Sequence, residues 1–354
     1  MWNRAKLAFW VGSVGFGLCA LGCGRDRDPN VDELTIGGYS VIQEVFQNGL
    51  VPAFEAQWQK KTGRTVRFEG SYVGSGAQAR SIISGFPADV AVLSHEGDMD
   101  LLVKGDRVKS SWRDGPDKGM ITNSLVVIGH RSGNPKGIKD WPDLAKPGVS
   151  VLYPDPKTSG GARWNINAIY GAAFLASRDA NQGKADIQSV HDFLKKVQAN
   201  VVNMDGSGRQ SMANFAERGT GDAVVTYENE ILLHNKDKKG DEVITYVIPP
   251  ATLLIESPAA LVETSVESHG NRAVAEAFIE FLHSQEGQRI FADFGFRSVK
   301  AATAAPAGSG AMPPKLFTMA DLGGWAKLES ELYGSKGLWT SIFTAEASSR
   351  ASGK

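Results

Sequence analysis

The chain has 354 residues, of which 42% are hydrophobic and 22% charged, so it can bury a substantial core in about two domains. It carries 38 Lys and Arg residues against 39 Asp and Glu residues, which excludes the basic excess typical of nucleic-acid-binding proteins. Any anion that the protein binds must therefore be held by local geometry and not by net charge.

Residues 1–23 have the features of a secretory signal peptide. Arg4 and Lys6 form a short positive region, and residues 7–22 follow without a charge. This uncharged stretch is too short and too rich in glycine for a comfortable membrane span. We therefore expect an exported protein that acts outside the cytoplasm, in the periplasm.

Both cysteines of the chain, Cys19 and Cys23, lie in this signal segment. Cys23 follows Ala-Leu-Gly and resembles the lipidated cysteine of a bacterial lipobox, although Ala20 stands where Leu is commoner. Cys23 is then the lipid anchor, and residues 24–33 are the tether; an ordinary signal peptide cleaved nearby is the alternative. Either way the mature protein holds at most one cysteine, so disulfides do not build it.

From residue 34 onward, short apolar runs alternate with amphipathic stretches. The runs that predict strands are residues 34–36, 66–68, 89–93, 125–128, 149–153, 201–202 and 223–225. The stretches that predict helices are residues 46–58 with a kink at Pro52, 76–85, a long segment through Ile169 and Phe174, 187–197 and 274–282. This alternation predicts an α/β fold with parallel sheets flanked by helices, in which ligands bind where strands end and helices begin.

Turns of small residues join a predicted strand to a predicted helix at residues 74–76 (Gly-Ser-Gly), 158–161 (Thr-Ser-Gly-Gly) and 205–209 (Asp-Gly-Ser-Gly-Arg). Each places free backbone N–H groups at a helix N-terminus, which carries roughly +0.5 of a charge. Three such ends converging on one point would form an anion site without a cationic side chain. Taken singly, each turn is an ordinary helix cap, so only convergence would make a site.

An ordered set of motifs resembles the bacterial periplasmic sulfate-binding proteins. The most specific is residues 156–165, Pro-Lys-Thr-Ser-Gly-Gly-Ala-Arg-Trp-Asn. The other motifs follow in family order at residues 74–79, 88–90, 141–144, 146–151, 219–222, 227–230 and 323–327. The resemblance covers residues 34–325 and implies a two-lobed, type II periplasmic-binding-protein-like fold. Each lobe is a mostly parallel sheet flanked by helices, and the lobes close over a dehydrated dianion.

This resemblance also predicts how the chain is divided. Lobe 1 is expected to comprise residues 34–119 and 253–300, and lobe 2 residues 120–252, with crossovers near residues 119–124 and 248–254. Residues 301–314, rich in Ala, Gly and Pro, are expected to be a linker. Residues 315–354 are expected to form a docked C-terminal tail.

The family's ligand donors can be carried over position by position. Ser75 would supply its hydroxyl, and Tyr227 stands where the family has a Trp whose indole N–H donates. Backbone N–H groups would come from Ser40, Ser159 (whose side chain helps), Gly160, Gly161 and Gly208. Because an imported dianion needs a carrier, the resemblance implies delivery of sulfate to the membrane permease of an ABC importer.

Several of these positions depart from the family pattern. Ser40 stands where the family has Asp, Gly208 where it usually has Ala, and Tyr72-Val73 where it has His-Gly. The hydroxyls of Tyr227 and Ser40 can accept as well as donate, whereas an indole only donates. Sulfate is fully deprotonated near neutrality and needs donors only. Phosphate carries a proton, which in a donor-only cleft meets another donor, and a buried polar group without a partner costs roughly 1–3 kcal/mol. We therefore expect sulfate first, with thiosulfate, molybdate and phosphate left open.

Three alternatives to sulfate import are a hydrolase, a ferric-ion-binding protein and a signalling protein. A hydrolase is less favoured, because neither Ser75 nor Ser159 lies in G-x-S-x-G or beside a histidine, although a distant histidine stays open. Ferric-ion binding by Tyr39, Tyr72 and Tyr227 is disfavoured because the donor-rich turns repel a cation, so aromatic packing is expected instead. Signalling to a membrane sensor in place of import is a third alternative.

The remaining expectations concern partners and supporting side chains. We expect no enzymatic activity, no cofactor, no bound metal and no nucleic acid, and a monomer, as is the habit of the family. The six histidines form no metal-binding pair and are expected to be mostly solvated at the surface. Arg163, Arg209 and Glu228 are expected to form salt bridges that hold the loops near the site.

Overall fold

The computed structural model describes residues 28, 30–300 and 304–351, with side chains described up to residue 344. The predicted signal peptide, the lipidation site at Cys23 and most of the tether lie outside these residues. None of the helices in the described part combines the length and apolar character needed to cross a bilayer.

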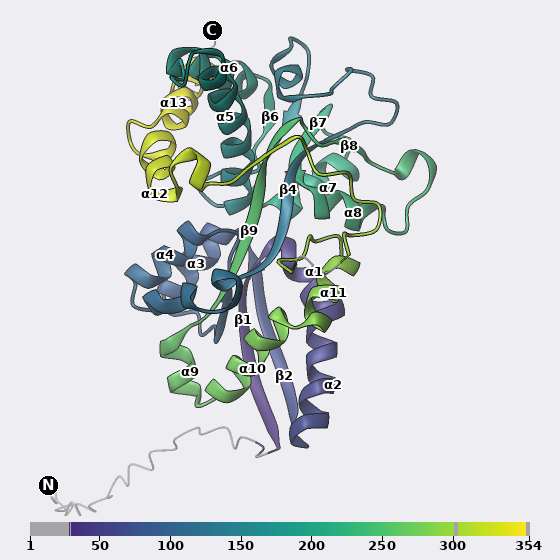
Figure 1. Ribbon diagram of the computed structural model, residues 1–354, viewed down its shortest axis with the longest axis vertical. Coiled ribbons are helices and arrows are strands. Elements are labelled where there is room, and N and C mark those ends of the chain that lie inside the picture. The colour runs from purple at the N-terminus through teal and green to yellow at the C-terminus, as the bar shows by residue number, and fades with distance from the viewer. Residues whose placement is uncertain (1–27, 29, 301–303, 352–354) are drawn as a thin grey trace, which may run out of the picture.

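Ten strands of the described residues pair in the order β2-β1-β3-β9-β4-β7-β5-β6, with β8 added to β4 and β10 to β9. Their bounds are β1 Val31–Tyr39, β2 Thr65–Val73, β3 Val90–Val92, β4 Met120–His130, β5 Val151–Leu152, β6 Val201–Asn203, β7 Ala223–Tyr227, β8 Thr245–Val247, β9 Ala251–Leu261 and β10 Lys315–Phe317. Figure 1 shows that the resulting molecule is elongated and has two lobes.

Each lobe has a parallel core with an antiparallel strand at one side. In lobe 1, β1 pairs in parallel with β2 and β3, and the end of β9 joins β3 in antiparallel orientation. In lobe 2, β5 pairs in parallel with β6 and β7, and β4 runs antiparallel to β7. The inner parallel strands β3, β5 and β7 are buried on both faces, which explains the continuous apolar runs that predicted them, whereas β2 lies at the edge and is partly exposed.

The two lobes are joined by β4 and β9, which run from one lobe into the other (Figure 1). The two strands pair with each other over residues 120–125 and 254–258. Beyond this segment, β4 pairs with β7 in lobe 2 and β9 pairs with β3 in lobe 1. The paired segment of β4 overlaps the predicted crossover at residues 119–124, whereas that of β9 overlaps the predicted residues 248–254 only at Leu254.

The helices cover the sheets of both lobes. Their bounds are α1 Gln43–Val45, α2 Val51–Thr62, α3 Ser75–Ile83, α4 Glu96–Lys104, α5 Gly160–Ala180, α6 Ile187–Ala199, α7 Gly208–Ala216, α8 Glu228–Asn235, α9 Glu263–His269, α10 Arg272–His283, α11 Gln285–Asp293, α12 Trp325–Leu328 and α13 Leu338–Ala351. The kink predicted at Pro52 appears as a π-helical turn over Phe46–Leu50 that joins α1 to α2. A proline lacks the N–H that an unbroken helix needs, so this local rearrangement is expected beside it.

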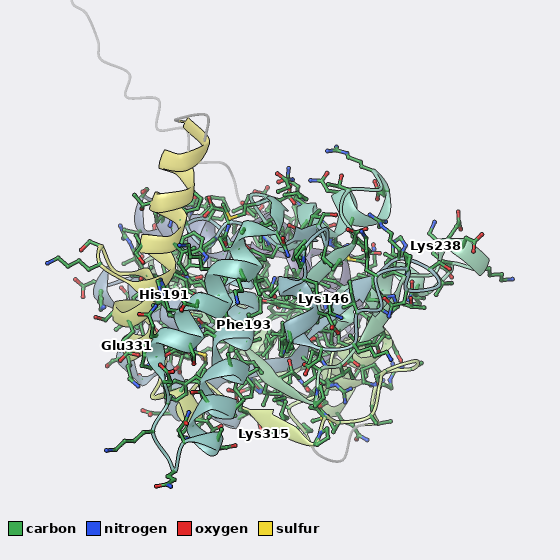
Figure 2. The ribbon with its side chains drawn as sticks, turned by 90° about the horizontal axis from the view of Figure 1, so that it is seen from above. Lys146, His191, Phe193, Lys238, Lys315 and Glu331 are labelled. Carbon is green, nitrogen blue, oxygen red and sulfur yellow. The ribbon has the colours of Figure 1, made fainter. Side chains whose placement is uncertain are left out.

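The C-terminal tail returns to both lobes. Strand β10 adds to β9, and α12, a π-helical turn over Glu329–Tyr333 and α13 follow it. In Figure 1, α13 lies beside α5 and α6 of lobe 2, while α12 reaches toward α4 of lobe 1. Figure 2 looks down on lobe 2 and shows charged side chains such as Lys146, Lys238 and Glu331 on its outside.

The expectation that most histidines are solvated is wrong. His95, His130 and His283 are buried, and His191, His234 and His269 are only partly exposed. His95 and His283 lie beside carboxylates, those of Asp98 and Asp117, which gives these rings a polar partner inside the protein.

Candidate functional site

The starts of several helices meet between the lobes. Each of α3, α5 and α7 follows a turn of small residues, as the sequence predicts. A Cβ atom placed on Gly74 would lie 2.4 Å from the carbonyl oxygen of Thr158 and 2.8 Å from that of Gly206. The three turns therefore approach so closely that only glycine fits at position 74.

The other predicted residues lie at the same place. Ser40 begins a short 3-10 turn over Ser40–Ile42, and a Cβ atom on Gly208 would lie 3.4 Å from Val41 Cγ2. Likewise, a Cβ atom on Gly161 would lie 3.6 Å from the hydroxyl oxygen of Tyr227. The structure thus brings together the residues predicted as donors: Ser40, Ser75, Ser159, Gly160, Gly161, Gly208 and Tyr227.

Gly160 and Gly161 are the first residues of α5, so their N–H groups have no intrahelical partner, whereas the predicted donor N–H of Ser159 already donates to the carbonyl oxygen of Asp155 at 2.8 Å. Ser159 occupies the N-cap position, but among the described residues its side chain caps none of these N–H groups. Ser207 at the start of α7 does act as a cap, by accepting from Gln210 N. Because a helix N-terminus leaves its first N–H groups without intrahelical partners, α5 presents donors and partial positive charge to the space between the lobes.

Ser75 is held differently from what its predicted role requires. Its hydroxyl donates to Asp98 Oδ2 at 2.6 Å and accepts from Ser94 N at 2.9 Å. A serine hydroxyl has a single proton, so Ser75 can donate to an anion only after that proton turns away from Asp98. The role of Ser75 as a hydroxyl donor therefore stays a prediction.

His95 lies beside this pair but is not arranged as a catalytic base. Its Nε2 lies 3.3 Å from Asp98 Oδ2, too poorly aligned for a hydrogen bond, and its Nδ1 accepts from Asp98 N at 3.2 Å. Burial lowers the pKa of His95 to about 4, which the Asp98 carboxylate only partly offsets. The hydroxyl of Ser75 faces Asp98 and not the imidazole, so the geometry lacks the serine–histidine contact of a hydrolase.

The tyrosines near the cleft keep their protons. Tyr227 OH lies 2.7 Å from Ser94 Oγ, and Tyr39 OH lies 3.0 Å from Ser257 Oγ. Burial raises the pKa of Tyr227 and Tyr39 well above the ordinary value, and it raises the pKa of Tyr72 to about 12. In the part of the chain that the structure describes, no cluster of His, Cys, Asp or Glu could hold a metal ion.

The predicted salt bridges near the motifs are present. Arg163 pairs with Glu329 of the tail, and Glu228 pairs with Arg297 at 2.7 Å. Arg209 bonds Glu44 of lobe 1 at 3.0 Å and the buried Glu230 of lobe 2 at 2.9 Å, so it links the lobes. Burial raises the pKa of Glu230, and the Arg209 guanidinium opposes this shift.

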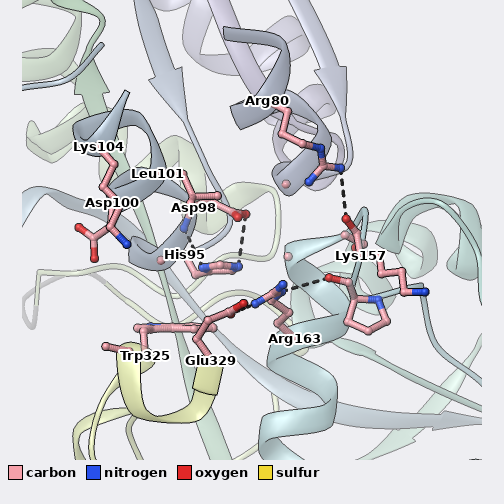
Figure 3. A pocket seen from close by; sticks show the side chains of 16 residues that line it. Arg80, His95, Asp98, Asp100, Leu101, Lys104, Lys157, Arg163, Trp325 and Glu329 are labelled. Carbon is pink, nitrogen blue, oxygen red and sulfur yellow. Dashed lines mark hydrogen bonds and ion pairs between the residues drawn. The ribbon is translucent and has the colours of Figure 1, made fainter. Parts of the chain in front are cut away.

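A pocket opens beside the start of α5, and charged side chains of both signs line it (Figure 3). Arg80 of lobe 1 donates to the carbonyl of Lys157 at 3.2 Å, and Arg163 turns toward Glu329. Trp325 stacks on His95 with ring centroids 4.0 Å apart. The walls of this pocket therefore come from both lobes and from the tail.

Two residues of this region, Ser94 and His95, were not among the predicted site residues. They follow β3 and lead into α4, so they obey the same strand-to-helix rule that identified the other turns. The signal was present in the sequence Leu-Ser-His-Glu-Gly-Asp at residues 93–98, but the following helix has only a short apolar stripe.

The chain is similar in sequence and in structure to known solute-binding proteins. The description "Bacterial extracellular solute-binding protein" belongs to the family model that matches residues 42–297. The chain is 40% identical to the sulfate-binding protein of Synechococcus elongatus, over 89% of this chain and 87% of that protein. It is 36% identical to the thiosulfate-binding protein of Escherichia coli, over 75% of this chain and 77% of that protein. The solved structure of the sulfate-binding protein SubI from Mycobacterium tuberculosis H37Rv is similar with a TM-score of 0.74 and 36% identity, over 85% of this chain and 99% of that one.

Proposed function

This chain belongs to the family of bacterial extracellular solute-binding proteins, and from that premise we propose that it captures sulfate for an ABC importer. The observation that carries the proposal is the meeting of the starts of α3, α5 and α7 between two lobes. Such a site favours an anion by backbone donors and helix dipoles. The relatives named as sulfate-binding proteins support sulfate as that anion.

Each donor has a role in this proposal. The N–H groups of Gly160 and Gly161, with Ser159, bind the anion at the uncapped start of α5. Ser40 and Gly208 add N–H groups from the two lobes, Ser75 adds its hydroxyl, and Tyr227 adds a phenolic O–H. All of these residues except the partly exposed Gly208 are buried, and a buried environment strengthens hydrogen bonds to the anion.

Thiosulfate is the second candidate ligand, because one relative is named for it. It is also a deprotonated dianion, and it differs from sulfate by one larger sulfur atom. Discrimination then depends on the size of the space and not on the number of donors. Comparing the two anions in one titration separates the candidates.

The cellular setting is part of the proposal. The family is extracytoplasmic, and we propose a periplasmic protein that delivers its anion to a permease in the membrane, as a monomer held there by a lipid on Cys23. We also propose that the protein performs no turnover. Incubation with sulfate esters, followed by assay for released sulfate, tests this: release in proportion to protein would contradict a pure binding role.

Isothermal titration of the chain without its predicted signal, with sulfate and thiosulfate, tests the proposed function. Wild type should bind sulfate, and Ser159→Asp should lose at least about a hundredfold in affinity, because like charges brought together cost several kcal/mol. Ser284→Asp is the matched control, since Ser284 caps α11 away from the cleft and Asp caps equally well. Unchanged sulfate binding in Ser159→Asp would contradict the site, and no binding in wild type would contradict the function.

A further inference from the structure

Ser94 connects the two lobes through its hydroxyl and its carbonyl. It is fully buried in the turn of lobe 1 that leads from β3 to α4. Its N–H donates to Ser75 Oγ at 2.9 Å, and its carbonyl accepts from Trp164 Nε1 of lobe 2 at 2.8 Å. Its hydroxyl lies 2.7 Å from the hydroxyl of Tyr227, also of lobe 2. Ser94 therefore contacts two residues of the proposed site, Ser75 of lobe 1 and Tyr227 of lobe 2.

The Ser94–Tyr227 hydroxyl pair lies directly beside the donors of α5. A Cβ atom placed on Gly160 would lie 2.8 Å from Ser94 Oγ, and one placed on Gly161 would lie 3.6 Å from Tyr227 OH. An anion held by the N–H groups of these two glycines is therefore within reach of both hydroxyls.

Two bonded hydroxyls can be ordered in two ways. If Ser94 donates to Tyr227, the phenol keeps its own proton free and donates to the anion. If Tyr227 donates to Ser94, the phenol oxygen is free to accept, and Ser94 directs its own proton to another oxygen of the anion. An indole N–H at this position could only donate, so the pair adds an acceptor without losing a donor.

Resting on the proposed function, we propose that Ser94 is a specificity-determining residue that lets the cleft bind a singly protonated tetrahedral oxyanion, such as hydrogenphosphate, as well as sulfate. Burial keeps Tyr227 protonated, because it raises the pKa of the phenol well above its ordinary value. The phenol proton must therefore find an acceptor whenever its oxygen accepts from the ligand, and Ser94 Oγ is that acceptor.

Removal of the Ser94 hydroxyl should affect the two kinds of anion differently. In Ser94→Ala, Tyr227 can still donate to sulfate, so sulfate binding changes little. A protonated anion leaves the phenol proton or its own proton without a partner, which weakens its binding roughly tenfold to a hundredfold. Ser257→Ala is the matched control, because Ser257 is also a buried serine bonded to a tyrosine hydroxyl, that of Tyr39.

The test is calorimetric titration of wild type, Ser94→Ala and Ser257→Ala in mildly alkaline buffer with sulfate, phosphate and monofluorophosphate. Monofluorophosphate has the shape and charge of hydrogenphosphate but lacks its proton. Wild type and Ser257→Ala should bind hydrogenphosphate more tightly than monofluorophosphate, and Ser94→Ala should lose this preference while keeping sulfate.

The outcomes separate the two proposals. If wild type binds no oxyanion, the proposed function fails and this inference fails with it. If wild type binds sulfate but shows no preference for the protonated anion, only the inference fails. The same holds if Ser94→Ala keeps the preference. If Ser94→Ala does not fold, the comparison of hydrogenphosphate with monofluorophosphate in wild type still tests the inference.

Discussion

At the scale of single residues, His95 is the clearest case of a side chain whose chemistry is set by its surroundings. It is buried with 1% of its surface exposed, against the ring of Trp325 and beside Asp98. Burial holds its pKa near 4, so the ring is neutral in the folded protein at neutral pH. An unfolded chain would protonate the same ring at an ordinary pKa of 6.5.

Acid should therefore destabilise the protein through His95. Between about pH 6.5 and pH 4 the unfolded state binds the proton and the folded state does not, so the free energy of unfolding falls as pH falls. The loss reaches up to about 3 kcal/mol near pH 4. Urea denaturation of His95→Phe, which keeps a ring for stacking, should show a smaller loss over this range. His191→Gln, at a partly exposed histidine, should behave as wild type; equal losses in all three proteins would contradict the prediction.

Residue types in the sequence predicted much of the site but not its interlobe contacts. Gly160 and Gly161 predict a helix start that a ligand can approach, because small residues between a strand and a helix do not cover the unpaired N–H groups of the first helical turn. Ser94 also lies between a strand and a helix, but its position in the sequence does not reveal its partner in the other lobe. Its partner Tyr227 is 133 positions away in sequence, and only the packing of the two lobes joins them.

At the scale of elements, the C-terminal tail joins the two lobes near the cleft mouth. Trp325 begins α12, stacks on His95 of lobe 1 at 4.0 Å, and meets Trp164 of lobe 2 edge-on at 4.7 Å. The sequence predicts a docked tail over residues 315–354, but it does not show that an indole from this tail lies between the lobes.

Trp325→Ala should weaken both the fold and anion binding. Truncating a buried Trp costs about 3–5 kcal/mol of stability, and the lost ring contacts with lobe 1 should raise the dissociation constant for sulfate by up to about tenfold. Trp339→Ala is the control, because Trp339 is buried but stacks on Phe343 within the tail. Its unfolding free energy should fall similarly while its sulfate affinity, measured by calorimetry, stays unchanged. Equal affinity losses in both variants would contradict a bridging role for Trp325.

At the scale of the whole molecule, the lobes are in a closed arrangement held by polar contacts across the cleft. Arg209 of lobe 2 bonds Glu44 of lobe 1, Arg80 of lobe 1 bonds the Lys157 carbonyl of lobe 2, and Ser94 bonds Tyr227. A closure of this kind, in which a hinge turns two rigid lobes, is the motion expected of the fold.

Loss of the Arg209–Glu44 bond should speed ligand release. Glu44 is partly exposed, and such pairs contribute about 0.2–1 kcal/mol, so Glu44→Gln should raise the dissociation rate of sulfate up to about fivefold. Arg209 keeps Glu230 as a partner, so no cation is left buried and unpaired. Stopped-flow tryptophan fluorescence measures the rate. Glu33→Gln removes an exposed pair with Arg67 inside lobe 1 and should leave the dissociation rate unchanged. An unchanged rate in Glu44→Gln would contradict a role of the Arg209–Glu44 bond in holding the lobes closed.

The passage of β4 and β9 between the lobes also fixes an order of folding. Lobe 2 is an insertion in lobe 1, since β3 at Val90–Val92 pairs with β9 only at Ala259–Leu261. The strands of lobe 2 lie between these segments and can pair while the end of the chain is still missing. Contacts between distant segments form slowly because a long loop must close first. The sheet of lobe 1, and with it the complete cleft, therefore cannot be finished before residues 259–261 are available to pair with β3.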